Sequence, residues 1–200
     1  MLLHSPRKVG ITLLCAGIVL YAGCRYWLET RTLIALDMPI SLSRGHITSA
    51  DFPINLKSGY YIAIGVERDA APKNVECLMW GCYDTPAILN VQWTLSSPKG
   101  TEASGSSNNS NGGSGNIGIV GRKVGNFVCA KRRYRLNADI LNDASILNEG
   151  RPRLKVIADG SGYNQVHRAY EGLSLFSGLL IIVGATLVFK PYDTTVSTVC

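Results

Sequence analysis

The chain has 200 residues, room for one or two domains, and 46% of them are hydrophobic. Its 20 Lys and Arg residues against 14 Asp and Glu give a formal net charge of +6, which favours acidic or anionic partners over basic ones. Much of the hydrophobic content lies in two blocks near the ends, so this is not the composition of one soluble domain with evenly spread apolar residues.

The first apolar block follows a short basic leader, residues 1–8, and we predict a transmembrane anchor or signal segment over 9–28. Arg25 interrupts this block near its end, but its long side chain can reach the membrane interface. We favour an uncleaved anchor. The alternatives are a cleaved signal peptide and a lipoprotein modified at Cys24, although Tyr21 stands where lipoproteins carry a smaller residue.

Between the two blocks, residues 29–171 show short runs of alternating apolar and polar residues bounded by Gly, Pro, Asn and Asp, and no amphipathic helix. This pattern predicts an all-β domain: a single β-sandwich, immunoglobulin-like or jelly-roll in strand order, flanked by N- and C-terminal transmembrane helices. The predicted strands are Leu33–Leu36, Ile40–Ser43, Phe52–Leu56, Tyr60–Glu67, Ile88–Ser96, Ile117–Val120, Asn126–Leu141 and Arg153–Ala158.

Two of these strands have faces that can be assigned. Trp93 shares one side of its strand with Leu89, Val91 and Leu95. We therefore interpret it as a core residue and prefer this to the alternative, an exposed ring on which a sugar stacks. The strand from Tyr60 is apolar on both sides, which is typical of the centre of a sheet.

The segment 99–116 consists almost wholly of Gly, Ser and Asn, and we predict a flexible loop there. Its glycines do not form a phosphate-binding loop, because no Gly-Lys-Ser or Gly-Lys-Thr follows them.

The cysteines indicate the cellular compartment in which the β-rich domain lies. Cys77 and Cys82 are close enough for a small disulfide loop, with Gly81 supplying the turn, and such a bond favours an exported domain. Cys129 lies in a strand-like run and is interpreted as a buried thiol. A metal site is not predicted, because neither His46 nor His167 has a partner at ligand spacing.

Basic residues alternate with apolar ones in two strands, so that the cations share one side of each strand. If the strands are neighbours, they form a positively charged wall that would bind a partner. Its residues are Lys131, Arg133, Arg135, Arg151, Arg153 and Lys155. The alternative is a solvated face that protects an edge strand from unwanted pairing.

The second apolar block, residues 172–189, has no charge and predicts a transmembrane helix followed by a cytoplasmic tail, 190–200. Its glycines permit close approach of another helix, but a plain anchor that tolerates glycine is the preferred interpretation. Two spans put both termini on one side. The basic leader places that side in the cytoplasm and the main domain outside the plasma membrane, although basic residues also flank the opposite ends of both spans.

No catalytic constellation, cofactor site or small-molecule site is predicted. Carboxylate pairs can be drawn from Asp139 with Asp143 or from Asp51 with Glu67, but acidic residues at turns and strand ends are typically solvated. We therefore predict a non-enzymatic, membrane-anchored envelope protein that captures or neutralises an acidic protein partner, in the manner of accessory or immunity-like proteins. The alternatives are a module for glycan or anionic lipid, or a structural subunit of a membrane complex; nucleic acid is disfavoured by the exported placement.

Overall fold

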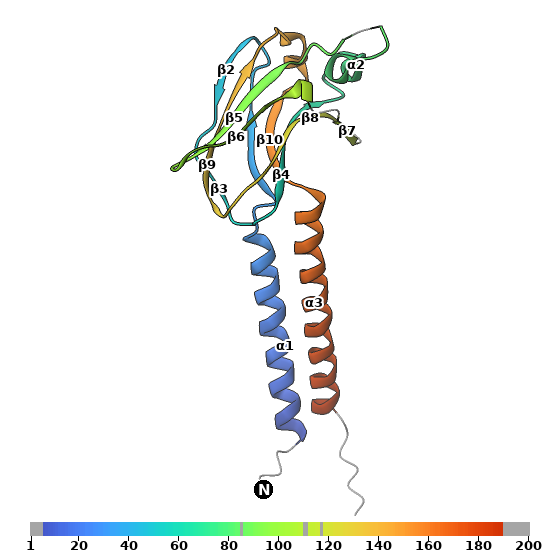
Figure 1. Ribbon diagram of the computed structural model, residues 1–200. Helices are drawn as coiled ribbons and strands as arrows, with labels where there is room; N and C mark the ends of the chain where they lie inside the picture. Colours follow the sequence, from blue (N-terminus) through green and yellow to red (C-terminus); the bar gives the residue numbers. More distant parts are fainter. Residues whose placement is uncertain (1–5, 85, 110–111, 117, 190–200) are drawn as a thin grey trace, which may run out of the picture. The chain divides into compact units, whose positions relative to one another are not determined.

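The computed structural model describes residues 6–84, 86–109, 112–116 and 118–189. The chain divides into a helical unit, residues 1–31 and 165–200, and a β-rich unit, residues 32–164. Figure 1 shows that the β-rich unit contains two layers, with β5 and β6 passing in front of β4 and β10.

The first sheet has five antiparallel strands in the order β1-β10-β4-β8-β7. Their bounds are Ile34–Pro39 for β1, Arg153–Ala158 for β10, Gly59–Glu67 for β4, Ile119–Val128 for β8 and Gly112–Asn116 for β7. The central place of β4 confirms the prediction made from its apolar residues on both sides.

The second sheet is also antiparallel, in the order β2-β9-β5-β6, and β3 pairs with β9 beyond the end of β2. The bounds are Gly45–Thr48 for β2, Arg132–Ile140 for β9, Val91–Ser97 for β5, Gly100–Ser106 for β6 and Phe52–Ile54 for β3. Ser49 continues the ladder between β2 and β3, because its amide donates to Leu136 O at 2.9 Å and its hydroxyl accepts the Leu136 amide at 3.0 Å.

Trp93 lies in the core between the two sheets, as predicted, with 4% of its surface exposed. Its indole Nε1 donates to Val124 O of the other sheet at 3.0 Å, and its ring lies 6.2 Å from that of Phe127. Two glycines make room for the indole. A Cβ on Gly105 would come within 2.8 Å of the Trp93 ring, and one on Gly125 would collide with it.

Strand β2 lies where no strand was predicted, several predicted strands differ in their bounds, and three predictions differ more substantially. Residues 40–43 form no strand; Leu42 is buried and its amide donates to Asn148 Oδ1 at 2.7 Å. The predicted strand 126–141 contains the end of β8 and all of β9, separated by a turn in which the Tyr134 hydroxyl bonds both the amide and the carbonyl of Ala130. The predicted strand 117–120 is only the start of β8; residue 117 itself lies outside the described residues.

The prediction of a loop without strands over 99–116 is wrong. Residues 100–106 form β6, which pairs with β5, and residues 112–116 form β7, which pairs with β8. Backbone hydrogen bonds build these strands, and a Gly/Ser/Asn composition does not prevent them.

Short helices also occur where none was predicted. Helix α2 spans Val75–Trp80, and 3-10 helices η1 and η2 span Ser107–Asn109 and Ser145–Gly150. Each is too short to show a helical period in the sequence.

The helical unit contains α1, Pro6–Glu29, and most of α3, Gly160–Phe189. Both helices are long and apolar enough to cross a membrane: the most apolar 18-residue windows have mean hydropathies of 1.6 and 2.2. Small residues lie where these two helices meet. A Cβ on Gly17 would come within 2.7 Å of Ile181, and one on Gly184 would come within 2.8 Å of Gly10 O.

Candidate functional site

The six predicted cations do not form one wall, because β9 and β10 belong to different sheets. The predicted directions of the side chains hold within each strand. Tyr134 and Leu136 of β9 and Leu154 and Val156 of β10 are buried, while the basic residues between them face outward. The prediction of a shared wall is therefore wrong about which strands are neighbours. The predicted inward and outward faces of the two strands are correct.

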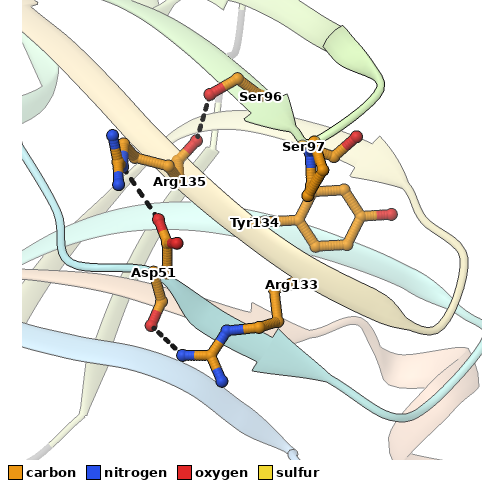
Figure 2. A pocket seen from close by; sticks show the side chains of 7 residues that line it. Asp51, Ser96, Ser97, Arg133, Tyr134 and Arg135 are labelled. Carbon is orange, nitrogen blue, oxygen red and sulfur yellow. Dashed lines mark hydrogen bonds and ion pairs between the residues drawn. The ribbon is translucent and has the colours of Figure 1, made fainter.

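The first group of cations lies on the outer face of the second sheet. Figure 2 shows Arg133 and Arg135 beside Asp51 in a hollow of about 210 Å³. Arg135 Nε lies 2.9 Å from Asp51 Oδ1, and Arg133 donates to Asp51 O at 3.4 Å. Lys131 precedes β9 and is exposed. The carboxylate of Asp51 thus offsets part of the positive charge on this face.

The second group lies on the outer face of the first sheet, around β10. Arg153 and Lys155 share the carboxylate of Asp37, at 2.6 and 3.4 Å. Arg151 pairs with Glu67 at 3.3 Å.

Lys123 of β8 joins this second group. The register places Lys155, Ala63 and Lys123 in one row across β10, β4 and β8, and the next row contains Arg153, Gly65 and Gly121. Because alanine and glycine occupy the middle of both rows, a hollow of about 200 Å³ opens between the lysines. Its lining comprises Tyr61, Ala63, Gly65, Ile119, Gly121, Lys123, Lys155 and Ile157.

We call the outer surface formed by this hollow together with Arg151, Arg153, Asp37 and Glu67 the cationic face. It carries four cations, Lys123 included, against two carboxylates. The sequence analysis did not include Lys123 among the cations because the predicted strand ended at Val120. A longer strand would have given the signal, since alternation along β8 puts Lys123 on the side opposite Val120 and Val124.

Arg122, next to Lys123, faces inward and is 8% exposed. Its Nη1 donates to Met79 O at 2.9 Å and to Leu89 O at 2.6 Å, and its Nη2 donates to Ser107 O at 3.2 Å. Burial of the guanidinium lowers the pKa of Arg122. This side chain therefore joins α2, the segment before β5 and η1 to β8, a role that no sequence motif indicates.

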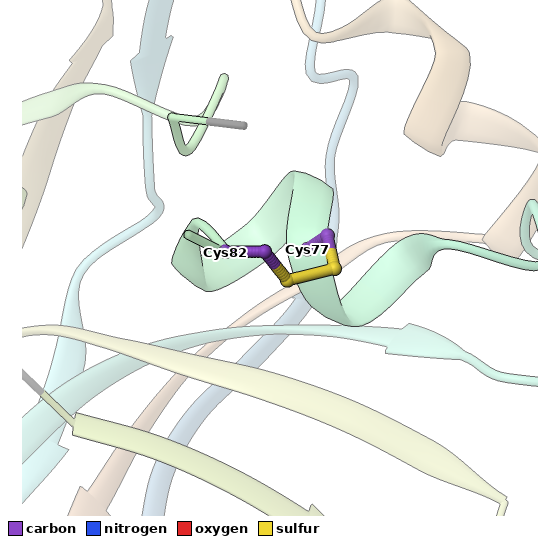
Figure 3. The surroundings of a disulfide bond; sticks show 2 residues. All are labelled: Cys77 and Cys82. Carbon is purple, nitrogen blue, oxygen red and sulfur yellow. A yellow bond between two sulfur atoms is a disulfide. The ribbon is translucent and has the colours of Figure 1, made fainter. Parts of the chain in front are cut away.

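Helix α2 carries the predicted disulfide between Cys77 and Cys82, whose Cα atoms are 5.0 Å apart (Figure 3). Gly81 has φ = 84°, a left-handed conformation that glycine adopts readily, and its amide donates to Cys77 O at 2.8 Å. The disulfide and the role of Gly81 in the turn are both confirmed. The bond indicates an oxidising, extracytoplasmic location for the β-rich unit.

His46 has polar partners that the sequence prediction did not foresee. Its Nδ1 lies 2.6 Å from Asp139 Oδ1, and its Nε2 lies 2.9 Å from Thr48 Oγ1. This order of carboxylate, imidazole and hydroxyl is that of a catalytic relay. Here it follows from strand pairing, since His46 stands opposite Asp139, and both side chains are more than half exposed.

The other carboxylates considered in the sequence analysis, Asp51, Glu67 and Asp143, each have a partner that is not a carboxylate. Asp51 pairs with Arg135 on the second sheet, Glu67 pairs with Arg151 on the first, and Asp143 accepts the amide of Ser145. Within the described ranges no group of three or more His, Cys, Asp and Glu residues could hold a metal ion.

Cys129 is a buried thiol, and burial raises its pKa to about 11. We expect iodoacetamide at pH 8 to leave Cys129 unmodified in the folded chain and to alkylate it fully in guanidinium chloride, as mass mapping of its peptide will show. Since the folded pKa exceeds the ordinary value of 9.0, the neutral thiol stabilises the fold below pH 9, and this contribution is lost as the pH rises towards 11. Fast alkylation of the folded chain at pH 8 would contradict burial.

No protein-family model and no curated protein matches the chain in sequence. Among solved structures, it is similar to the crystal structure of a protein from Sulfurospirillum deleyianum, with a TM-score of 0.46 and 11% identity over 62% of this chain and 97% of the other. It is also similar to the insecticidal delta-endotoxin Cry8Ea1 from Bacillus thuringiensis, with a TM-score of 0.27 and 11% identity over 63% of this chain and 20% of the toxin. Both similarities are too low to support an inference about function.

Proposed function

We propose that this chain is a membrane-anchored binding protein of the cell envelope whose exported domain captures an acidic protein partner through the cationic face. One observation carries the proposal: Lys123 and Lys155 stand on either side of a hollow whose floor is Ala63, Gly65 and Gly121. Small floor residues leave space for a partner's side chain, and the excess of cations on this face attracts negative charge.

Membrane anchoring is supported by the exposure of apolar surface on the two long helices. Only 17% of the most apolar window of α1, and 11% of that of α3, is buried by the chain itself. The core helix of a soluble protein would bury most of such a surface, whereas a lipid bilayer accommodates it. We place both termini in the cytoplasm and the β-rich unit outside the plasma membrane, which agrees with the disulfide.

For the β-rich unit we propose a single sandwich in jelly-roll order. When β3 and β7 are set aside, the remaining eight strands, renumbered in chain order, run 1-8-3-6 in one sheet and 2-7-4-5 in the other. This is the order of a jelly roll. An immunoglobulin-like order would put the first two strands side by side in one sheet, but β1 and β2 lie in different sheets.

The test uses the full chain in detergent and a fluorescein-labelled peptide of eight glutamates, followed by fluorescence polarisation. We expect the peptide to bind, and binding to weaken about tenfold when Lys123→Glu and Lys155→Gln are combined, because repulsion replaces attraction. Affinity should also fall as salt rises. Lys155→Gln is used instead of Glu because Asp37 lies 3.4 Å from the Lys155 ammonium.

The matched control is Arg133→Glu with Arg135→Gln, which removes the same amount of positive charge from the other sheet, places no new carboxylate beside Asp51 and should leave binding unchanged. If the peptide does not bind, or if both pairs of substitutions act equally, the proposal is wrong. Binding of uronate oligosaccharides or anionic vesicles in place of the peptide would favour the glycan or lipid alternative.

A further inference from the structure

We propose that the partner lies on the cationic face as an extended segment of about six residues, in which every second side chain is acidic. This inference rests on the proposed function and adds to it the conformation and the sequence pattern of the partner. Two hollows carry it, because they continue each other along β4 and β10.

The hollow between Lys123 and Lys155 is continued by a second hollow of about 520 Å³. On β4, Gly65 lines the first hollow and Glu67 lines the second. On β10, Lys155 lines the first and Arg153 lines the second. Side chains two residues apart in a strand point to the same side of the sheet, so both hollows open on one face. We call the two hollows together the groove.

The cations of the groove stand in rows at a regular spacing. Lys155 and Arg153 of β10 occupy the first two rows. Arg151 adds a third, because it pairs at 3.3 Å with Glu67, two residues after Gly65 on β4. Successive rows are about 6.6 Å apart, which is also the distance between alternate side chains of an extended peptide. Three acidic side chains, spread over about six residues, can therefore each meet a cation.

The floor of the groove is narrow. Ala63 lies between Lys155 and Lys123, so the strands that carry these lysines are two strand spacings, about 10 Å, apart. A helix with its side chains is about 10–12 Å across and does not enter between them, whereas an extended chain does. In the next row the floor is Gly65 and Gly121, so the groove stays open along its length.

Arg151 occupies the groove in an unfavourable backbone conformation. Among the residues that the structure describes, it is the only one other than glycine with a positive φ, 49°. Its side chain is 77% exposed, and an ion pair as exposed as that with Glu67 contributes little to stability. Binding explains an arginine where glycine would be preferred, since a guanidinium has five N–H donors and can hold a partner's carboxylate as well as Glu67.

The test compares two fluorescein-labelled hexapeptides of equal charge on the full chain in detergent, by fluorescence polarisation: Glu-Ser-Glu-Ser-Glu-Ser and Glu-Glu-Glu-Ser-Ser-Ser. When extended, the alternating peptide directs all its carboxylates to one side, and the block peptide directs one fewer. We expect the alternating peptide to bind about fivefold more tightly, the gain from one more charge-assisted contact. Equal binding, or tighter binding of the block peptide, would overturn the extended segment and leave the proposed function intact.

Ala63→Leu tests the groove without changing its charge. The larger side chain fills the floor between the lysines, so the alternating peptide should bind about tenfold more weakly. The matched control is Thr94→Leu, which adds a leucine to the outer face of the second sheet, since Trp93 and Leu95 on either side of Thr94 are buried. This control should bind as the wild type does. Equal affinities of the two leucine variants would overturn the groove.

Arg151→Gly is the second variant, and glycine suits the left-handed backbone at this position. The midpoint of thermal unfolding should not fall, and the preference for the alternating peptide should disappear because the third row has lost its cation. A preserved preference or a lower midpoint would overturn the role of Arg151 and the proposal with it. If neither hexapeptide binds but eight glutamates do, the groove is wrong. If none of the peptides binds, the proposed function is wrong.

Discussion

Arg122→Met is expected to lower the free energy of unfolding by about 4 kcal/mol, because it leaves three carbonyl groups in the core without their donor. These carbonyls belong to Met79, Leu89 and Ser107, which lie on three separate segments. Methionine fills much of the same space but donates no hydrogen bond. Water cannot easily take the place of the guanidinium, since only 8% of Arg122 is exposed.

Urea unfolding of the full chain in detergent, followed by near-ultraviolet circular dichroism, will measure the loss. The control is Lys123→Met at the next position of β8, where the side chain faces outward and the change should stay within about 0.5 kcal/mol. A loss below about 1 kcal/mol for Arg122→Met would mean that other donors replace the guanidinium, and the structural role assigned to it would be wrong.

Alternation predicted the direction of side chains well, because burial on a sheet follows a period of two. The predicted bounds 153–158 are those of β10, and Trp93 and Tyr134 are buried as expected. Alternation carries no information on which strands are neighbours. The basic residues of β9 and β10 could therefore be assigned to outer faces but not to the same face.

Arg122 could not be assigned from the sequence for a different reason. A basic residue at an inward position is recognisable only once the carbonyls it meets are known, and these come from positions 15 to 43 residues away. Residues 100–116 misled the prediction in a similar way. Glycines there suggested flexibility, yet Gly105 lies in β6, where its missing side chain leaves room for Trp93.

The two apolar blocks were assigned correctly as long apolar helices, but the role of their glycines in packing one helix against the other was not predicted. The sequence favoured a plain anchor that merely tolerates glycine. In the structure Gly10 and Gly17 of α1 lie against α3, and a Cβ on Gly17 would come within 3.0 Å of Ser177 O. Ser177 and Gly184 share the seven-residue spacing of Gly10 and Gly17, which keeps small residues on one side of each helix. The spacing of small residues on one span indicates helix packing only when a matching spacing on the other span is known to face it.

Gly184→Leu is therefore expected to separate α1 from α3. A Cβ at this position would lie 2.5 Å from Leu14 N and 2.8 Å from Gly10 O, and backbone atoms cannot turn aside as a flexible side chain would. Close approach of the two backbones is the main source of attraction between helices in lipid, where no hydrophobic force drives them together.

The measurement is a cross-link made by a short bis-maleimide between cysteines placed at Arg25 of α1 and Tyr170 of α3, whose side chains are hydrogen-bonded to each other, in a chain with Cys15, Cys24 and Cys200 changed to serine. The reagent should join the two cysteines within one molecule, and Gly184→Leu should reduce the yield at least about fivefold, a loss of about 1 kcal/mol in helix association. Gly178→Leu is the matched control on the same helix, because a Cβ there meets nothing within 4 Å and the cross-link should persist. Equal yields from the two leucine variants would show that the glycines do not hold the helices together, and α3 would then be the plain anchor that its composition alone suggests.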